Sequence, residues 1–211
     1  MSNSHTGQGS LFVIAAPSGG GKTSLVNGLL NRDSRLALSV SHTTRPPRPG
    51  EVDGRHYYFL SEAEYEQMVD NGDFLEHARV FDHHYGTNRN SVGLQLAQGH
   101  DVILEIDWQG ARQVRSAFPG SCFIFIIPPS VEILRKRLTG RGQDSAEVIK
   151  RRMRDAQAEI SHWAEFDQLV VNDDFDTALE ELLAIINDHR KQSPHKVNKN
   201  YQHLAQQLGK S

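Results

Sequence analysis

Ala16-Pro17-Ser18-Gly19-Gly20-Gly21-Lys22-Thr23 stands between an apolar run of strand length, Leu11–Ala15, and a segment of helical character that begins near Lys22. The three consecutive glycines let the backbone approach an anion closely, and the helix that follows presents unpaired amides. Lys22 adds a positive charge, and Thr23 offers a hydroxyl to magnesium. The pattern predicts a phosphate-binding loop whose ligand is a nucleoside triphosphate.

The motif departs from GxxxxGKT at its first position, where this chain has Ala16. The change removes one conformational freedom and leaves the phosphate-binding mechanism intact. An ordinary glycine-rich turn is the alternative interpretation. The strand before the motif, the helix after it and the Lys-Thr pair together favour the phosphate-binding loop.

Apolar runs of strand length recur along the chain, and helical stretches separate most of them. Such alternation predicts an α/β fold with a parallel five-stranded sheet flanked by helices, whose ligands gather at the carboxyl ends of the strands. The expected strands are Leu11–Ala15, Leu36–Ser41, Val102–Ile106, Cys122–Ile127 and Leu169–Val171.

Two helix starts can be identified from capping residues. Ser61 and Glu64 form a possible capping box with Gly72 as the stop, and Asp144 with Glu147 forms another. After the second start, apolar residues at helical spacing are expected to pack in the core: Ile149, Met153, Ala156, Ile160 and Trp163.

The length of 211 residues allows one well-buried core with an inserted subdomain. Residues 42–99 are far longer than a simple crossover requires, which predicts a binding insertion. A Gly- and Arg-containing link predicts a lid over residues 139–155. The remaining ranges are a flexible N-terminus 1–9, a core of 10–41, 100–138 and 156–190 within a domain of 10–190, and a polar C-terminal tail 191–211.

The formal net charge is −3, with both signs interspersed along the chain. No global field therefore favours nucleic acid or a membrane as a partner. Cys122 is the only cysteine, so an intrachain disulfide is excluded and a reducing compartment fits. The polar N-terminal segment resembles neither a signal peptide nor a membrane anchor, so a cytoplasmic location is expected.

The segment SHTTRPPRPGE, residues 41–51, follows an expected strand and carries Arg45 and Arg48 on a proline-stiffened loop. A guanidinium presents paired donors that match phosphate oxygens. The segment therefore favours a second phosphate site, with a solvated basic turn as the alternative.

Glu76 and Asp107 supply acceptor-only carboxylates that could face one pocket. Guanine offers neighbouring N1–H and N2–H donors to such groups, whereas adenine presents a lone pair at N1. A mismatched base would leave buried groups unpaired, at a cost of about 1–3 kcal/mol each. The two acids therefore indicate a guanine site.

The chain resembles guanylate kinases from about Phe12 to Arg190. The motifs that carry the resemblance are APSGGGKTS, VSHTTRPPRPGEVDGRHYYF, FLEHA, YGT, EIDWQGA, LTGRGQDS and VVNDD, and their order and spacing are highly specific. The resemblance implies a P-loop NTPase-type fold with a nucleoside-monophosphate-binding insertion and a lid. It also implies transfer of the terminal phosphoryl group of MgATP to GMP, giving ADP and GDP, in purine nucleotide recycling, with dGMP as a further expected acceptor.

The resemblance assigns residues to each substrate. The guanine base is expected against Ser41, Glu76, Thr87 and Asp107, and the GMP phosphate against Arg45, Arg48, Tyr57 and Tyr85. The ATP site is expected to comprise Ala16, Pro17, Ser18, Gly19, Gly20, Gly21, Lys22, Thr23, Ser24 and Asn172, and the catalytic cations to be Lys22, Arg45, Arg137, Arg141 and Arg152.

Some of these positions have structural alternatives. Tyr57 and Tyr85, taken alone, are more often core or surface residues. Asn172 is expected beside the ATP adenine, but it could instead cap the next helix with Asp173 or Asp174.

Magnesium is the expected cofactor, with Thr23 as a ligand and Glu105 as a possible ligand through water. Glu105 is a second departure, because the family more often has aspartate there. The alternative is that Glu105 is only a polar residue at the end of a strand and does not contact magnesium.

A phosphate monoester is already an anion near neutral pH, so the predicted reaction needs no general base. Two alternatives stay open: a catalytically inactive scaffold that binds phosphorylated partners in the same cleft, and an enzyme with a different phosphorylated acceptor. The sequence does not distinguish a monomer from a homo-oligomer.

Overall fold

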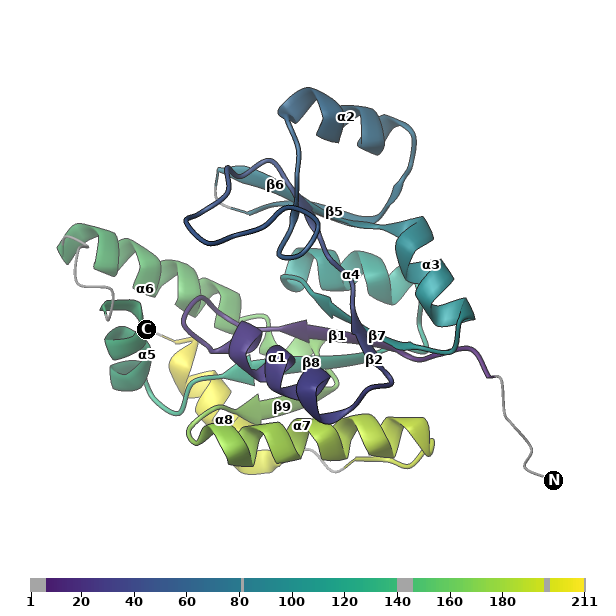
Figure 1. Ribbon diagram of the computed structural model, residues 1–211. Coiled ribbons are helices and arrows are strands. Elements are labelled where there is room, and N and C mark those ends of the chain that lie inside the picture. The colour runs from purple at the N-terminus through teal and green to yellow at the C-terminus, as the bar shows by residue number, and fades with distance from the viewer. Residues whose placement is uncertain (1–6, 81, 140–145, 196–197, 211) are drawn as a thin grey trace. The chain divides into compact units, whose positions relative to one another are not determined.

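The computed structural model describes residues 7–80, 82–139, 146–195 and 198–210. In these residues the strands form two β-sheets (Figure 1). The larger sheet has five strands in the order β2-β7-β1-β8-β9. Its strands are β1 (Leu11–Ala15), β2 (Leu36–Leu38), β7 (Asp101–Glu105), β8 (Cys122–Ile127) and β9 (Gln168–Val171).

The strands of this sheet pair in parallel, as expected. Leu36 of β2 lies opposite Asp101 of β7, and Ile124 of β8 lies opposite Gln168 of β9. All six residues of β8 are buried, as a strand covered on both faces requires. The predicted α/β fold with a parallel five-stranded sheet flanked by helices is confirmed.

The second strand is shorter than expected, because it ends at Leu38 and not at Ser41. The Ser39 amide still donates to the Ile103 carbonyl at 3.0 Å, whereas the Ser41 carbonyl accepts from Tyr58 N–H at 2.9 Å. The chain therefore leaves the first sheet within three residues and enters the second.

The smaller sheet has the order β4-β3-β6-β5, with β3 (His42–Thr43), β4 (Tyr58–Phe59), β5 (Phe74–Val80) and β6 (His83–Asn88). Between β4 and β5 runs α2 (Glu62–Asp70), whose capping box is confirmed. The Ser61 hydroxyl accepts from the Glu64 amide at 3.3 Å, and the Glu64 carboxylate accepts from the Ser61 amide at 2.8 Å. Gly72 follows the helix with a φ of +71°.

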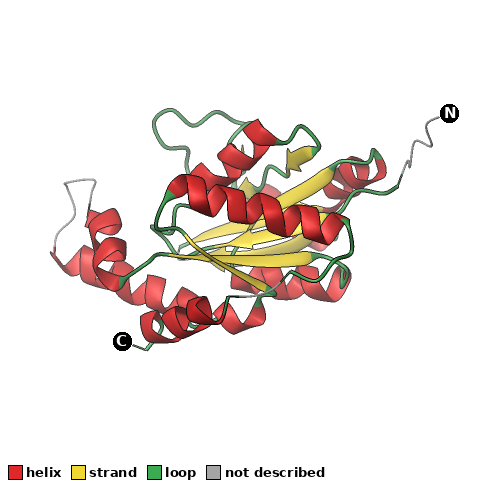
Figure 2. Cartoon of the chain, turned by 90° about the horizontal axis from the view of Figure 1, so that it is seen from below, coloured by secondary structure: helices red, strands yellow, loops and turns green. Residues whose placement is uncertain are grey.

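The other helices lie along the strands, as Figure 2 shows in red against yellow. Met153, Ala156 and Ile160 are buried, as the helical spacing predicted. These residues lie on α6 (Ala146–Ile160), whereas Trp163 lies beyond the end of α6 in a 3₁₀ turn, Trp163–Glu165. Asp144, the predicted cap, lies outside the described residues. The helices are α1 (Lys22–Arg32), α3 (Arg89–Ala97), α4 (Trp108–Ala117), α5 (Val131–Thr139), α6 (Ala146–Ile160), α7 (Phe175–Arg190) and α8 (Lys199–Leu208).

The chain divides into two compact units, and the division passes through β1. Unit 1 comprises Met1–Val13 and Ser34–Ser121, and unit 2 comprises Ile14–Asp33 and Cys122–Ser211. The core, insertion and lid boundaries expected from the sequence stay a prediction. Within the described ranges, no helix combines the length and apolarity that crossing a membrane requires.

Candidate functional site

The glycine-rich loop of unit 2 leads from β1 into α1. Gly21 is the N-cap of α1 with a φ of 87°, Gly19 has a φ of +83°, and the Gly20 amide donates to the Pro17 carbonyl at 2.8 Å. A glycine cap has no side chain to accept from the first-turn amides, and the first turn carries no acidic residue. This helix terminus therefore suits an anion.

Ala16 does not strain this loop. Among the described non-glycine residues, only Gln192 has a positive φ. Alanine thus adopts the backbone conformation that its position requires. Lys22, Thr23 and Ser24 follow in the first turn of α1, with the Thr23 and Ser24 side chains exposed.

Asn172 lies directly after β9 and is only 6% exposed. Its side-chain amide donates to the Gly20 carbonyl at 2.8 Å, and its backbone amide donates to the Ile127 carbonyl at 2.9 Å. Asp174, not Asn172, caps α7, since its carboxylate accepts from the Thr177 amide at 2.9 Å. Asn172 therefore joins the end of the sheet to the glycine loop.

Two of the predicted arginines are held by backbone carbonyls, Arg137 by a residue after β9 and Arg152 by a residue at the end of α5. Arg137 donates from Nη2 to the Asn172 carbonyl at 2.8 Å, while its buried Nη1 has no hydrogen-bond partner among the described residues. Arg152 of α6 donates from Nη1 to the Leu138 carbonyl at 3.0 Å, and α5 and α6 lie side by side in Figure 1. Arg141 lies outside the described residues.

Glu159 of α6 is a neighbour of the loop that the sequence analysis missed. Its carboxylate accepts from the Ser18 amide at 2.9 Å. The two residues are 141 positions apart, and an acid on a helix beside the buried Ile160 carries no local signal of such a contact. Only the tertiary fold reveals it.

In unit 1, Glu76 and Thr87 meet across the β5–β6 pair. Glu76 is 3% exposed, and the Thr87 hydroxyl donates to its Oε1 at 2.6 Å. The two residues stand opposite each other in the strand register. The structure therefore places a buried carboxylate beside a buried hydroxyl, both predicted to contact guanine.

Asp107 is the N-cap of α4, a capping role that the sequence analysis missed although an Asp before the helical WQGA segment could have indicated it. Its Oδ1 accepts from the Gln109 and Gly110 amides, each at 3.0 Å. A Cβ at Gly110 would lie 2.3 Å from Oε2 of Glu76. The two predicted carboxylates therefore approach the same glycine.

Three of the four predicted phosphate ligands, Arg45, Arg48 and Tyr57, lie in the loop between β3 and β4, and the fourth, Tyr85, lies on β6. Arg45 is 8% exposed and lies with its guanidinium carbon 5.4 Å from the Tyr57 ring centroid. The Tyr57 and Tyr85 rings meet edge to face with centroids 6.0 Å apart. Burial raises the pKa of the Tyr57 phenol, so this group is a hydrogen-bond donor at neutral pH.

Two further predicted site residues, Arg48 of this loop and Ser41 before β3, stand apart from that cluster. Arg48 has an exposed side chain. Ser41 immediately precedes β3 and contacts β4 through its backbone carbonyl. The structure therefore brings Arg45, Tyr57 and Tyr85 together, and it shows no side-chain contact from Ser41 or Arg48 to them.

Glu105, the last residue of β7, has a buried Oε1 with no hydrogen-bond partner among the described residues. An orphaned carboxylate oxygen suits a magnesium-bound water. Within the described ranges, no three His, Cys, Asp or Glu side chains are grouped to hold a metal. Magnesium in nucleotide sites needs no such group, because phosphates and waters supply most of its ligands.

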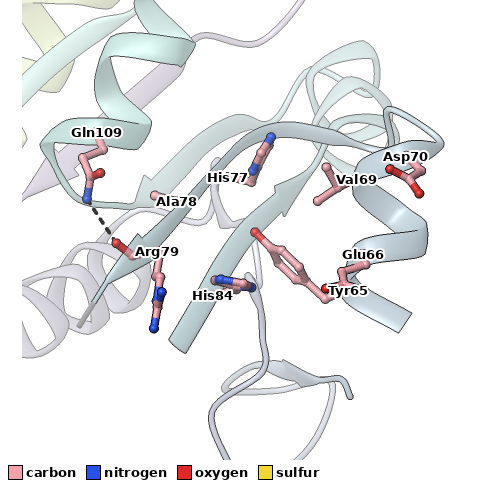
Figure 3. Close-up of a pocket in the computed structure, with 9 residues that line it drawn as sticks. All are labelled: Tyr65, Glu66, Val69, Asp70, His77, Ala78, Arg79, His84 and Gln109. Atoms are coloured by element: carbon pink, nitrogen blue, oxygen red, sulfur yellow. Dashed lines mark hydrogen bonds between the residues drawn. The ribbon is translucent and has the colours of Figure 1, made fainter. Parts of the chain in front are cut away.

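A separate cavity of about 450 Å³ lies between α2 and the β5–β6 pair (Figure 3). Tyr65 of α2 and His84 of β6 face it, with ring centroids 5.0 Å apart. None of its lining residues is a predicted substrate residue.

The chain is similar to guanylate kinases over nearly its whole length. A sequence model described as "Guanylate kinase" matches residues 8–189. The guanylate kinase of Alkalilimnicola ehrlichii is 57% identical over 200 residues, covering 95% of this chain and 97% of that protein. The guanylate kinase of Nitrosococcus oceani is 60% identical over 182 residues, covering 86% and 90%.

The comparison of folds also shows similarity to a guanylate kinase. The crystal structure of guanylate kinase from Anaplasma phagocytophilum superposes with a TM-score of 0.72 at 32% identity, covering 90% of this chain and 88% of that one. With sequence motifs, fold and relatives in agreement, the chain belongs to the guanylate kinase family.

Proposed function

We infer that this chain transfers the terminal phosphoryl group of ATP to GMP, giving ADP and GDP. The observation that carries the choice of acceptor is the approach of Glu76 and Asp107 to the same glycine, Gly110. Two carboxylates placed together can accept from guanine N1–H and N2–H, a pattern that adenine lacks. Thr87 and Ser41 complete the proposed base site.

The proposed site for the GMP phosphate consists of Arg45, Arg48, Tyr57 and Tyr85. The Arg45 guanidinium supplies charge-assisted hydrogen bonds, and the phenols supply neutral donors. The cluster of Arg45 with the two tyrosine rings supports this proposal.

The proposed ATP site is the loop from Ala16 to Ser24, with Asn172 beside it. Lys22 neutralises charge on the transferred group, and Arg137, Arg141 and Arg152 close over it. The positive φ of Gly19 and Gly21 and the glycine cap of α1 support the assignment. So does Nη1 of Arg137, which finds no hydrogen-bond partner in the described part of the chain and so has donors to spare.

Magnesium fits this chain. Thr23 would bind it directly and Glu105 through water, and the bound ion would neutralise phosphate charge. The protein's own contribution is alignment of two anionic nucleotides and exclusion of water. No general base is required, because the second pKa of the acceptor phosphate is near 6.

We place the reaction in purine nucleotide recycling in the cytoplasm, with ATP and GMP as substrates and dGMP as an additional acceptor. The location stays a prediction from the sequence, and it fits the buried state of Cys122.

The test is to mix the purified chain with ATP, magnesium and one nucleoside monophosphate at a time, and to follow ADP release. Release with GMP and dGMP, and not with AMP, CMP or UMP, is expected. ADP release with a different monophosphate would assign another acceptor, and binding of phosphopeptide without ATP binding would assign the inactive scaffold.

The guanine site is tested by Glu76→Gln. We expect the KM for GMP to rise at least about tenfold while the KM for ATP is unchanged, because an amide replaces only part of the double acceptor. Equal losses for both nucleotides would contradict the base site.

A further inference from the structure

We propose that Glu51 is a positioning residue that fixes Arg45 for the phosphate of GMP. The inference rests on the proposed role of Arg45. It goes beyond that role because Glu51 itself need not touch either nucleotide.

Glu51 binds the Arg45 guanidinium with both of its oxygens. Nη2 of Arg45 lies 2.8 Å from Oε1 and 2.9 Å from Oε2, and Nη1 donates to the Pro46 carbonyl at 2.8 Å. A guanidinium has five N–H donors, so these contacts fix the group and leave donors for phosphate oxygens. Aromatic rings also surround the Arg45 guanidinium. Its carbon lies 5.4 Å from the ring centroid of Tyr57, which precedes β4, and 5.9 Å from that of Phe59 on β4.

Glu51 is itself anchored by the backbone of the second arginine. The Arg48 amide donates to Oε2 of Glu51 at 2.7 Å, and the Glu51 amide donates to the Arg48 carbonyl at 3.0 Å. One carboxylate therefore holds the side chain of Arg45 and the backbone of Arg48. Hydrogen bonding from Arg45 also keeps the pKa of Glu51 below its usual range, so the group is ionised at neutral pH.

The opposite role for Glu51 would be that of a phosphate mimic, which occupies Arg45 until GMP displaces it. A mimic must leave when the ligand arrives. Glu51 would then lose its bonds to the Arg45 side chain and to the Arg48 amide, and Arg45 is already nearly buried where it stands. The two roles predict opposite changes in affinity when the carboxylate is removed.

Glu51→Gln distinguishes the two roles, because they predict opposite changes in the affinity for GMP. A glutamine cannot accept at both positions, so one bond is lost and Arg45 is less well oriented. We expect the KM for GMP and its Kd from calorimetry to rise about tenfold, with kcat changed less than about threefold and the KM for ATP unchanged. An unchanged or lower KM for GMP would overturn the proposal.

Glu51→Asp separates geometry from charge, because it keeps the charge and loses reach. A raised KM for GMP is expected here also, and wild-type behaviour of this variant would overturn the geometric argument. Glu64→Gln is the matched control: it changes a carboxylate of unit 1 that belongs to a capping box, where Gln is tolerated, and GMP binding should not change.

A double-mutant cycle with Arg45→Lys assigns the effect. If Glu51 acts chiefly through Arg45, removing its carboxylate should weaken GMP binding less in the Arg45→Lys background than in the wild type, with the remaining loss coming from the Arg48 backbone that Glu51 also holds. Additive losses would overturn the proposal. If Arg45→Lys leaves GMP binding unchanged, the proposed phosphate site itself fails, whereas a weakened Arg45→Lys beside a normal Glu51→Gln removes only the inference about Glu51.

Discussion

Gly21 has a φ of 87°, and a Cβ at this position would lie 2.2 Å from Nδ2 of Asn172. An alanine there would be strained in its backbone and would also displace a side chain that is almost fully buried. The glycine of the loop is thus required by its neighbour as well as by the approach of a phosphate.

We expect Gly21→Ala to lower kcat/KM for ATP at least about a hundredfold while GMP binding measured by calorimetry is retained. Gly72→Ala is the matched control, since Gly72 also has a positive φ, +71°, but nothing within 4 Å of a Cβ. The control should lose about 1 kcal/mol of stability and keep its kinetics. Similar kinetic losses in both variants would show that backbone strain, not the contact with Asn172, is responsible.

Asn172→Ala removes the donor that binds the Gly20 carbonyl and leaves a buried acceptor unpaired. We expect a raised KM for ATP, an unchanged KM for GMP, and a melting temperature lower by about 3–8 °C, from a cost of about 1–3 kcal/mol. Asn198→Ala is the control, because Asn198 is only the N-cap of α8. If ATP kinetics do not change in Asn172→Ala, the amide is not needed to hold the loop.

Sequence patterns identified the glycine loop because a single run of residues defines it. The contact of Asn172 with Gly20 and that of Glu159 with Ser18 were beyond sequence reasoning, since each joins residues more than 140 positions apart. Asp107 was predicted to be a guanine ligand, but its N-cap role on α4 was not predicted. A residue type that suits two roles does not say which role its neighbours allow.

At the scale of elements, one face of the smaller sheet stacks aromatic rings and histidines. His42 of β3 stacks on Tyr58 with centroids 4.7 Å apart and meets Phe74 edge to face at 5.7 Å. Its Nδ1 is buried without a hydrogen-bond partner among the described residues. Burial lowers the pKa of His42, although the Gly86 backbone and the charge of Asp53 oppose the shift.

This shift makes the stability of the smaller sheet sensitive to acid. The folded pKa of His42 lies below the unfolded value of about 6.5, so the unfolded chain binds more protons and stability falls as pH drops through this range. His42→Phe keeps the stacking and removes the titration. We therefore expect urea unfolding of the variant to show a smaller loss of stability between about pH 7.5 and 5.5 than the wild type.

His203→Gln, which removes an exposed histidine of α8, is the control and should keep the wild-type pH dependence. An identical loss of stability in His42→Phe and wild type would mean that His42 titrates normally in the folded state.

Elements with a strong local signal were predictable, and short ones were not. The capping box of α2 and the fully apolar β8 follow from a few adjacent residues. By contrast, β3 and β4 have two residues each, too few for any periodicity, and they pair across the intervening loop. The predicted end of β2 at Ser41 was wrong for the same reason, because the Ser41 carbonyl accepts from the Tyr58 amide of β4, a strand that no pattern reveals.

At the scale of the molecule, the two compact units divide between them the residues proposed for the two nucleotides, although Glu105, proposed for magnesium, lies in unit 1. Unit 1 holds every residue proposed for GMP, from Ser41 to Asp107. Unit 2 holds the loop from Ala16 to Ser24 together with Arg137, Arg152 and Asn172. We therefore expect GMP alone to stabilise mainly unit 1, and ATP alone to stabilise mainly unit 2.

Hydrogen exchange tests this division. GMP alone should slow exchange in residues 41–59 and 83–88 of unit 1, because its phosphate and base would bind there. A non-hydrolysable ATP analogue with magnesium should slow exchange in residues 16–24 and 131–139 of unit 2. Protection by GMP confined to unit 2 would refute the assignment of ligands to units.

Transfer between two nucleotides in different units further requires that the units act together. Both ligands are highly negative, and an open site would hydrolyse ATP, so alignment and exclusion of water should come from closure when both are bound. We expect small-angle scattering to show a smaller radius of gyration with GMP and the ATP analogue together than with either alone. AMP in place of GMP is the control and should give no such change, since it lacks the donors that Glu76 and Asp107 accept. An unchanged radius with both correct ligands would mean that catalysis proceeds without closure, which would contradict the roles predicted for the lid and the insertion.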